Sequence, residues 1–494
     1  MREMSSLQLK KNIEKAERAI QEKRETAGQG KMRQQFHFMA ESGWINDPNG
    51  LIYFHGQYHL FYQFNPFKPA WGEMYWGHAV SDNLVDWTYL PVALAPSENY
   101  DSHEQGGCFS GTSIEYDGKL YLLYTGTSSG EHGFVQVQCL AESSDGITFE
   151  KYEGNPVLRA PAGYDECDFR DPKVWSHDDS FYMICGTKKD GYAKLLLFKS
   201  ADLKKWEYKS VMAESRGEWG EMWECPDFYS IEGTDVLTFS PVGAGERKTV
   251  YMTGQLDYQT GKFCCTREGE VDWGFDYYAP QTLEDEDGRR IMFGWAGGWD
   301  WMPWWNGHGP SEKEEWCGFF GIPREVRLLD DHSLQFIPVK ELESLRRREM
   351  ISVSEESITE ETPFFLPDVR IYEMKLSINL KESQAECCIL RLCGTEDFYT
   401  DITADLKNGE LRVDRNHSDK WNHGVSRSNL YLQDKERLDL HIFMDQSSVE
   451  VFADEYRNVH TCRLYSDSGQ CRNRIMTMGG TVRIEHLKLW SFRC

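Results

Sequence analysis

Three acidic side chains stand in short segments that could hold a carboxylate in place for chemistry. Asp47 lies in the run WINDPNG, Asp171 in FRDP and Glu224 in MWECPD. The first two directly precede a proline, which fixes its own φ and biases the preceding residue toward extended geometry. In the first run, the Asn-Gly pair after the proline favours the positive φ values of a hairpin turn. We therefore predict a tight turn that immobilises Asp47.

The neighbours of the other two acids suggest two different ionisation states. Arg170 stands beside Asp171 and favours its ionised form, whereas Trp and Cys flank Glu224, and apolar surroundings favour a protonated carboxyl group. Cleavage of a glycosidic bond uses such a pair. One ionised carboxylate meets the anomeric carbon, and a protonated carboxyl group serves the departing oxygen. The pattern therefore predicts acid/base chemistry on a glycoside.

Each segment also has a purely structural explanation. Every residue of Asn-Asp-Pro-Asn-Gly is a common turn former, Arg170 and Asp171 could form a structural ion pair, and Glu224 could be an exposed residue beside a turn. Catalysis is favoured only if the three acids meet, so the elements that carry them decide between these interpretations.

Short apolar and aromatic runs separated by Gly, Asp, Asn and Pro fill residues 36–330 and predict strands. A repeat is visible within them, in which a serine is followed by a polar turn and, six residues after the serine, by an aromatic residue. It begins at Ser81, Ser143 and Ser200, at intervals of 62 and 57 residues. A unit of this size built from short strands is typical of a four-stranded propeller blade, and the segment has room for about five.

The spacing of the acids fits this repeat. Asp171 follows Asp47 by 124 residues, and Glu224 follows Asp171 by 53, which is close to two blades and to one blade. Because equivalent positions of the blades converge at one end of the central channel, we expect the three carboxylates to meet there.

Two further segments predict helices. Residues 1–33 carry apolar side chains at helical spacing and predict an N-terminal helical extension, which Gly28 and Gly30 end. Residues 336–350 predict a linker helix, with Pro338 in its first turn and three consecutive arginines in its last.

The last part of the chain, residues 351–494, shows strict alternation of apolar and polar side chains. This pattern predicts antiparallel strands with one buried face, as in a β-sandwich. The predicted fold class is therefore all-β, with a five-bladed β-propeller over 34–335, a β-sandwich after it and a short N-terminal helix.

Composition argues against several kinds of partner and cofactor. The 494 residues include 54 Lys and Arg against 80 Asp and Glu, and the formal net charge of −26 disfavours nucleic acid and anionic membranes as partners. The sequence has no apolar run long enough to cross a bilayer, and its charged start lacks the apolar centre of a signal peptide. Fourteen scattered cysteines form no C-x-x-C zinc pattern. We expect reduced thiols in a cytoplasmic protein without a bound metal.

The three acidic segments, in this order, resemble the signature motifs of glycoside hydrolase family 32. Further segments are similar to the family as well, among them 58–66, 76–79, 109–112, 278–282 and 443–452. The family comprises β-fructofuranosidases, including invertases, sucrose-6-phosphate hydrolases and exo-fructanases. Its architecture of a five-bladed propeller followed by a β-sandwich agrees with the pattern of strands.

The resemblance implies a role for each acid. Asp47 matches the nucleophile, Glu224 the general acid/base, and Asp171 the carboxylate that binds fructosyl hydroxyls and stabilises the transition state. The other matched positions line the fructose pocket, with Trp44 and Phe109 as its apolar wall: Trp44, Asn46, Gln63, Trp71, Phe109, Ser110, Arg170 and Trp295. The implied reaction is retaining hydrolysis of terminal β-fructofuranosyl units without a metal or organic cofactor. Retention requires the carboxyl groups of Asp47 and Glu224 to lie about 5–5.5 Å apart.

Several alternatives stay open. The substrate could be sucrose, sucrose 6-phosphate or a short fructo-oligosaccharide, and we find no motif for a substrate phosphate. A non-catalytic carbohydrate-binding protein could use the 17 Trp and 24 Tyr for stacking, although three converging acids argue against it. A related five-bladed furanosidase acting on arabinose or xylose is the other enzymatic alternative. The N-terminal helix and the sandwich are candidate contact surfaces for a homo-oligomer.

Overall fold

The computed structural model describes residues 2–130, 133–303, 305–307, 309–395, 397–466 and 472–493. Its regular structure is almost entirely β, in agreement with the predicted class. One α-helix, α1 (Arg2–Gly28), precedes the strands, and two short 3-10 segments interrupt them: η1 (Ser311–Glu314) and η2 (Lys340–Leu345).

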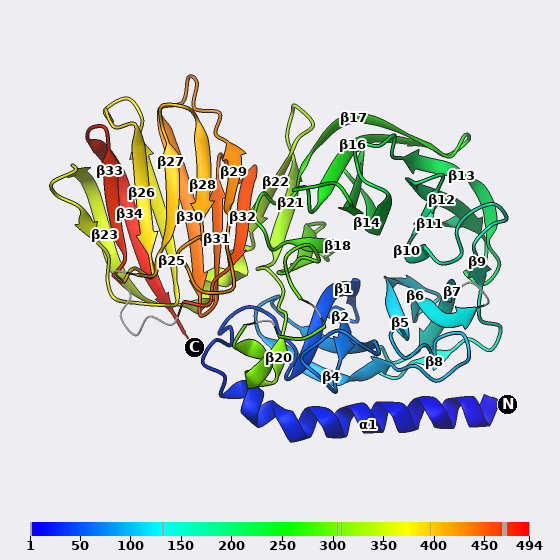
Figure 1. Ribbon diagram of the computed structural model, residues 1–494. Coiled ribbons are helices and arrows are strands. Elements are labelled where there is room, and N and C mark those ends of the chain that lie inside the picture. The colour runs from blue at the N-terminus through cyan, green and yellow to red at the C-terminus, as the bar shows by residue number, and fades with distance from the viewer. Residues whose placement is uncertain are drawn as a thin grey trace.

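The first part of the chain forms five sheets that follow one another in sequence (Figure 1). The first contains β1 (Gly43–Phe54), β2 (Gln57–Asn65), β3 (Tyr75–Ser81), β4 (Trp87–Leu94) and β20 (Trp316–Cys317). The second contains β5 (Cys108–Tyr116), β6 (Lys119–Gly130), β7 (Gly133–Ser143), β8 (Glu150–Lys151) and β9 (Leu158–Arg159). The third contains β10 (Phe169–His177), β11 (Ser180–Lys189), β12 (Tyr192–Ser200) and β13 (Glu207–Glu214).

The fourth sheet contains β14 (Met222–Ile231), β15 (Thr234–Val242), β16 (Val250–Asp257) and β17 (Lys262–Glu270). The fifth contains β18 (Tyr278–Glu284), β19 (Arg290–Trp295), β21 (Arg324–Leu328) and β22 (Leu334–Pro338). The first strand of each sheet contacts the first strand of the next, and β18 contacts β1. The sheets therefore close into a ring, which is the arrangement of a propeller. Strand β20 also returns to pair with β1 in parallel.

The serine repeat marks the same turn in three sheets. Ser81, Ser143 and Ser200 are the last residues of β3, β7 and β12, the third strands of their sheets. Each serine hydroxyl donates a hydrogen bond within the turn that follows, as Ser81 Oγ does to the Asp86 carbonyl oxygen at 2.7 Å. The repeat therefore marks the step from the third strand to the fourth.

The last part of the chain forms two six-stranded sheets (Figure 1). One contains β23 (Arg346–Ile358), β34 (Val482–Phe492), β25 (Tyr372–Asn379), β30 (Arg437–Asp445), β31 (Ser448–Ala453) and β32 (Asn458–Arg463). The other contains β24 (Phe364–Phe365), β33 (Arg474–Met478), β26 (Cys387–Leu392), β27 (Thr400–Asp405), β28 (Glu410–Asp414) and β29 (Val425–Asn429). Alternate residues of β25, such as Met374 and Leu376, are buried in the core between the sheets. The predicted sandwich is confirmed.

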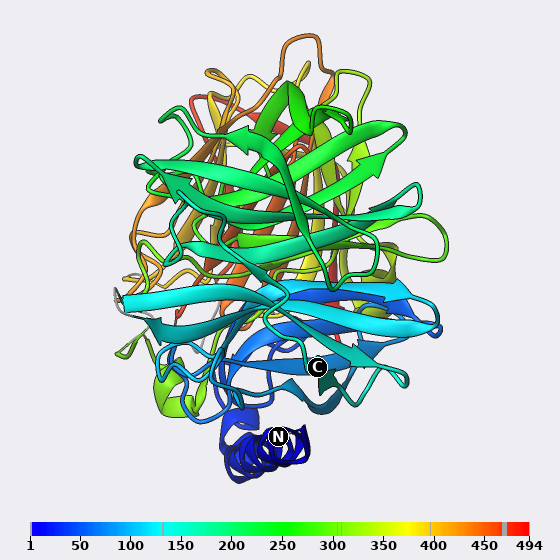
Figure 2. The same ribbon diagram turned by 90° about the vertical axis from the view of Figure 1, so that its right-hand side faces the viewer.

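Helix α1 lies along the outside of the first sheet and is seen end-on in Figure 2. The apolar side chains that predicted the helix face the propeller, and Leu9, Ala16 and Ile20 are buried. Glu17 Oε1 also accepts a hydrogen bond at 2.8 Å from the backbone N of Val92 in β4, the edge strand of that sheet. The helix thus covers a strand edge that would otherwise be open to pairing with other chains. Among the described residues, no helix has the length and apolar character to span a membrane.

The linker helix predicted over 336–350 is wrong in its extent. Pro338 ends strand β22, only Lys340–Leu345 form a 3-10 segment, and the three arginines begin β23. Strand β34 pairs with β23, and Arg346 Nε donates a hydrogen bond at 2.6 Å to buried Glu373 of β25. Sheet pairing and this ion pair override the preference of arginines for a helix end.

Buried charges join the propeller to the sandwich. The ring of His37, before β1, lies between Asp445 and Glu450 of the sandwich, with Nδ1 to Oδ2 at 2.7 Å and Nε2 to Oε1 at 2.9 Å. Burial alone would lower the pKa of His37, but the hydrogen bonds and negative charges of these two acids outweigh burial and raise that pKa to about 9. Arg324 of β21 adds an ion pair to Glu450 at 2.7 Å.

Candidate active site

Each first strand of the propeller carries a bulge at the same level. The register shifts lie between Ile45 and Pro48, Phe109 and Gly111, Arg170 and Lys173, Glu224 and Asp227, and Tyr278 and Gln281. A bulge re-aims the side chains around it. Asp47, Ser110 and Asp171 lie inside these irregularities, and Glu224 lies at the edge of one. The bulges therefore direct chemically useful side chains of different sheets into one region.

Three of the bulges share an unusual backbone conformation. Asp171, Cys225 and Ala279 have φ values of 63°, 46° and 51°, although each precedes a proline. Left-handed φ is uncommon for residues other than glycine and marks a strained position that its surroundings must hold. One such support is the backbone N of Cys225, which donates a hydrogen bond at 2.9 Å to Asp171 Oδ2. Strain therefore concentrates where the acids meet.

The segment 44–50 is not the hairpin turn that its residues predict. It lies within β1, and two register shifts absorb its irregular residues. Gly50 does take a positive φ of 52°, and an added Cβ there would lie 2.9 Å from Phe61. Pro48 has no N–H to donate to a ladder, so a bulge suits it. Asp47 is immobilised as predicted, but by strand pairing on a buried sheet and not by a turn.

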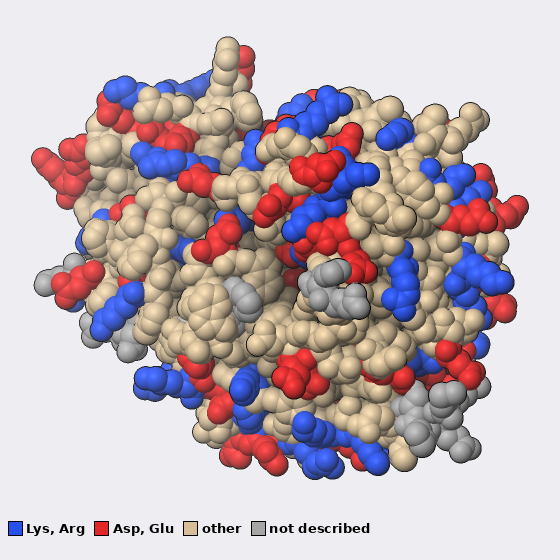
Figure 3. Space-filling view, turned by 45° about the vertical axis from the view of Figure 1, so that its right-hand side comes forward, with Lys and Arg blue, Asp and Glu red and all other residues tan. Residues whose placement is uncertain are grey.

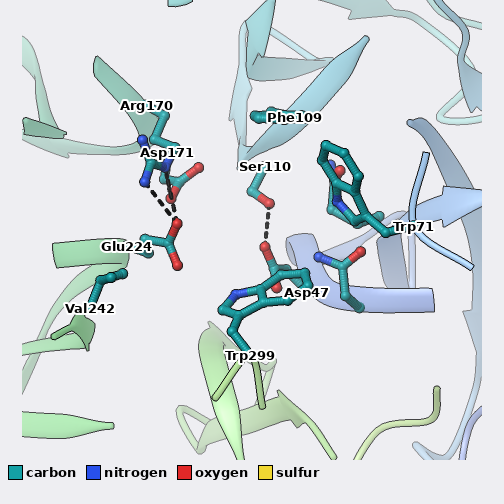
Figure 4. Close-up of a pocket in the computed structure, with 11 residues that line it drawn as sticks. Asp47, Trp71, Phe109, Ser110, Arg170, Asp171, Glu224, Val242 and Trp299 are labelled. Carbon is teal, nitrogen blue, oxygen red and sulfur yellow. Dashed lines mark hydrogen bonds and ion pairs between the residues drawn. The ribbon is translucent and has the colours of Figure 1, made fainter. Parts of the chain in front are cut away.

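A cavity of about 310 Å³ lies among these bulges (Figure 4). Its lining includes all three predicted catalytic acids and six of the eight predicted substrate-binding residues: Asn46, Asp47, Gln63, Trp71, Phe109, Ser110, Arg170, Asp171 and Glu224. Figure 4 shows Asp47 on one wall and Arg170, Asp171 and Glu224 on the facing wall. The distant motifs of the sequence therefore meet in one pocket.

Two predicted binding residues lie outside that lining. Trp44 and Trp295 are buried, and both contact Trp299, with ring centroids 6.3 and 4.7 Å from it. Trp299 itself lines the cavity, together with Val242. The position of Trp299 in a Gly- and Trp-rich loop gave no strand or motif signal, so the sequence analysis missed it. Trp44 also donates a hydrogen bond from Nε1 to Asn46 Oδ1 at 2.8 Å and thereby orients a lining residue.

Asp47 is almost completely buried, and its surroundings set its ionisation. Ser110 Oγ donates a hydrogen bond to Asp47 Oδ2 at 2.6 Å, and the Cys225 thiol lies 3.3 Å from the same oxygen. Burial raises the pKa of Asp47 to about 6, the charge of Glu224 adds to the rise, and the hydrogen bond from Ser110 opposes it. Asp47 is thus an ionised carboxylate near neutral pH, with one oxygen held in place.

This ionisation predicts the acid limb of the activity. The family resemblance implies that Asp47 is the nucleophile, and a carboxylate attacks carbon only when it is ionised, so kcat/KM should fall about tenfold per pH unit below pH ~6. Ser110→Ala removes a hydrogen bond to the ionised form and should move the acid limb to higher pH. Initial rates on sucrose, the substrate that the family resemblance implies, measure the acid limbs of the wild type and of Ser110→Ala between pH 4 and 8, at substrate concentrations well below KM. An acid limb near pH 4, or one that Ser110→Ala leaves in place, would contradict this assignment.

The surroundings of Glu224 differ from those that its sequence neighbours suggested. The Trp223 ring stacks on Phe239, with ring centroids 4.0 Å apart, and does not surround the Glu224 carboxyl group with apolar surface. Instead, Arg170 Nη2 donates to Glu224 Oε1 at 2.8 Å, and the Tyr278 hydroxyl donates to Oε2 at 2.5 Å. Successive strand residues point to opposite faces, and this explains the difference. Tyr278, which the sequence analysis did not single out as a site residue, thus holds the second oxygen.

Arg170, Glu224 and Tyr278 are 54 residues apart in sequence and occupy equivalent positions before the bulges of β10, β14 and β18. The sequence itself shows this periodicity, since each of the three residues stands two positions before a proline. The repeat explains how a hydrogen-bonded row of three side chains forms across three sheets.

The ionisation expected for Asp171 also needs correction. Burial raises its pKa to about 7, and the charges of Glu224 and Asp47 act in the same direction. Arg170 lowers that pKa, as the sequence suggested, but its Nε is 4.0 Å from Asp171 Oδ2, and its closest contacts are with Asp168 and Glu224. Because Arg170 is shared among several acids, its effect on Asp171 is smaller than that of burial, and the pKa of Asp171 rises.

The described residues contain no group of three or more His, Cys, Asp or Glu placed to hold a metal ion. The chemistry of the pocket is that of paired carboxyl groups, each fixed by hydrogen bonds from hydroxyl or guanidinium donors.

Known proteins share both the sequence and the fold. Residues 37–338 match the glycosyl hydrolases family 32 N-terminal domain, and residues 341–491 match the C-terminal domain of that family. A sucrose-6-phosphate hydrolase of Zymomonas mobilis is 35% identical over 484 residues, covering 93% of this chain and 92% of its own. A raffinose invertase of Escherichia coli is 36% identical over 471 residues, covering 92% and 94%.

Among solved structures, a β-fructofuranosidase of Bombyx mori aligns with a TM-score of 0.83 at 32% identity, covering 97% of this chain and 98% of its own. A sucrose-6-phosphate hydrolase of Lactobacillus gasseri aligns with a TM-score of 0.82 at 27% identity, covering 96% of both chains. The matches span the propeller and the sandwich. The protein is therefore a glycoside hydrolase and belongs to glycoside hydrolase family 32.

Proposed function

We propose that the protein is a retaining β-fructofuranosidase that cleaves the fructosyl bond of sucrose. The observation that carries this proposal is the placement of Asp47 and Glu224 on facing walls of one cavity, each fixed by its own donors. Relatives that share the whole chain length are named sucrose-6-phosphate hydrolase, raffinose invertase and β-fructofuranosidase. All of these names describe enzymes that act on a sucrose unit or on a β-fructofuranoside.

The proposed reaction has two steps. Asp47 attacks C2 of the fructosyl unit, the bond from C2 to the glycosidic oxygen breaks, and Glu224 gives its proton to that oxygen. The product of this step is a fructosyl ester of Asp47. Glu224, now ionised, then takes a proton from water, whose oxygen attacks C2 and releases Asp47 as a carboxylate. Both acids return to their starting states.

Other side chains of the cavity support these steps. Ser110 fixes one oxygen of the nucleophile, and Arg170 and Tyr278 orient Glu224. Asp171, with its raised pKa, is placed on the wall of Glu224 and would accept hydrogen bonds from fructosyl hydroxyls once it is ionised. Trp71, Phe109 and Trp299 provide apolar surface for the sugar ring.

Sucrose 6-phosphate is the second candidate substrate, since several relatives carry that name. A comparison of kcat/KM for sucrose, sucrose 6-phosphate, raffinose and 1-kestose tests the choice, because this ratio measures differential binding of the transition state. We expect fructose to be released, with sucrose or its 6-phosphate as the best substrate. No fructose from any of the four would overturn the proposal and favour a non-catalytic sugar-binding protein.

We also propose that the enzyme works in the cytoplasm. Eleven cysteines within the described part of the chain are free, including the adjacent exposed pair Cys264 and Cys265. Free thiols in such number suit a reducing compartment. Equal specific activity with and without a thiol reductant in freshly lysed cells, together with unmodified thiols by mass spectrometry, would support this; disulfide-linked protein in cells would contradict it.

A further inference from the structure

A row of alternating charges runs from Lys188 to Glu224. Lys188, near the end of β11, pairs with Asp168 Oδ2 at 2.6 Å, and Asp168 Oδ1 pairs with Arg170 Nη1 at 2.6 Å. Arg170 then donates through Nη2 and Nε to Glu224 Oε1 at 2.8 and 3.2 Å. Asp168 directly precedes β10 and does not line the cavity, but it contacts Arg170, which does.

The arginine in this row is shared between two acids. Its Nη1 faces Asp168 and Gln136, while Nη2 faces Glu224. A guanidinium that faced Glu224 alone would stabilise the ionised form of that acid, which is the wrong form for the first proton transfer. Asp168 places a second negative charge on the opposite side of Arg170 and so weakens this effect. The side chains of Asp168 and Arg170 are only 23% and 13% exposed, so water screens their charges incompletely.

The charged and titratable groups that face Glu224 come from four strands. They are Arg170 and Asp171 of β10, Tyr278 of β18, Asp47 of β1 and its own neighbour Cys225. Arg170 is the only cation among them. Arg170 is therefore the group through which the charge of Asp168 can reach Glu224.

We propose that Asp168 is a positioning residue that holds Arg170 and partly neutralises it, so that the charge of Arg170 opposes proton donation by Glu224 less strongly. The inference rests on the proposed function, because it requires Glu224 to be the general acid. Lys188 pairs with Asp168 and carries the opposite charge. Removing one or the other should therefore shift the alkaline limb of kcat/KM in opposite directions.

The test is the pH dependence of kcat/KM for Asp168→Asn. A charge directly beside a carboxyl group shifts its pKa by about 1–3 units. Asp168 contacts Arg170 and not Glu224, so its effect should be smaller. We expect the alkaline limb on sucrose to move down by roughly 0.5–1 pH unit, with an approximately three- to tenfold loss of kcat/KM on that limb. Lys188→Met should move the same limb to higher pH. Asp168→Glu, which restores the charge, should bring the limb back toward that of the wild type.

A purely structural role for Asp168 would give a different result. β-D-Fructofuranosyl fluoride needs little acid assistance because fluoride is a good leaving group, so Asp168→Asn should lower its cleavage by less than about threefold. A distorted pocket would lower cleavage of both substrates equally and leave the limb in place. Glu214→Gln is the matched control, since it removes a lysine-paired carboxylate of the same sheet away from the cavity. It should change neither limb.

The failure of this inference can be told apart from the failure of the proposed function. If Glu224→Gln lowers kcat on sucrose by about 10²-fold or more and the wild-type pH profile is bell-shaped, the proposed function stands. An alkaline limb that Asp168→Asn leaves unmoved, or moves upward, would then overturn the role of Asp168 alone. If Glu224→Gln keeps wild-type activity, the proposed function falls and the role of Asp168 falls with it.

Discussion

Asp47→Asn should lower kcat on sucrose by about 10⁴-fold or more, because it removes the proposed nucleophile and with it the covalent route. Glu224→Gln should lower it by about 10²- to 10⁴-fold, the usual contribution of a general acid. Both side chains line the same cavity, and an amide reproduces the size of each but not its charge or proton. Steady-state rates with purified variants measure the two losses.

The activated fluoride substrate separates the two roles. Glu224→Gln should cleave β-D-fructofuranosyl fluoride far better than sucrose, since this leaving group needs little protonation, whereas Asp47→Asn should be inactive on both. Wild-type activity in either variant, or equal losses of Glu224→Gln on both substrates, would refute the roles.

Loss of activity in Asp47→Asn should not come from loss of folding. The folded-state pKa of Asp47 is raised to about 6, so the protonated carboxyl group is favoured in the folded protein. Its contribution to the free energy of unfolding is fully present below the unfolded-state pKa and is lost as pH rises through 6. At pH 8 the ionised, buried carboxylate therefore opposes folding by up to about 3 kcal/mol. The neutral amide removes this penalty, so Asp47→Asn should unfold at the same or a higher temperature than the wild type at pH 8.

His37→Gln should destabilise the protein by about 3–5 kcal/mol, the usual cost of removing one partner from a buried ion pair. The imidazole touches both Asp445 and Glu450, and all three side chains are completely buried, so the variant leaves two buried acids without the cation between them. Since these contacts join the propeller to the sandwich, the variant should also lose cooperativity between the two parts. Denaturant unfolding followed by tryptophan fluorescence measures both effects.

The same site predicts how stability responds to alkali. The folded-state pKa of His37 is raised to about 9, so its stabilising contribution is present below about pH 6.5 and is lost as pH rises through 9. The free energy of unfolding of the wild type should decline over this window, and His37→Gln should abolish that part of the decline. His423→Gln, which changes an exposed histidine of the sandwich, is the control and should leave the decline intact. A decline that His37→Gln does not alter would contradict the assignment.

Much of the fold was predictable because its signals are local and repeated. Alternation in β25 predicted the sandwich, and the serine turns at 81, 143 and 200 predicted sheets of constant size. The meeting of Asp47, Asp171 and Glu224 followed from the same periodicity together with the family motifs. These features depend on the chain pairing with its nearest neighbours in sequence.

The details of the site were less predictable because they depend on partners that lie far apart in sequence. Local turn chemistry around Asp47 was overridden by pairing of β1 with β2. The expected wall around Glu224 was replaced by Arg170 and Tyr278, which come from the two neighbouring sheets. Trp299 enters the cavity from an irregular loop that has no periodic pattern. In each case tertiary contacts, and not sequence neighbours, determine the surroundings of the side chain.

The central claim is that Asp47 forms a covalent fructosyl intermediate, so that the configuration at C2 is retained. Hydrolysis of sucrose in water containing methanol tests it directly, because methanol traps the intermediate as a methyl glycoside that does not mutarotate. Two displacements at C2 predict methyl β-D-fructofuranoside as the first product seen by NMR. Methyl α-D-fructofuranoside would show a single inverting displacement and would contradict the assignment of Asp47 as the nucleophile.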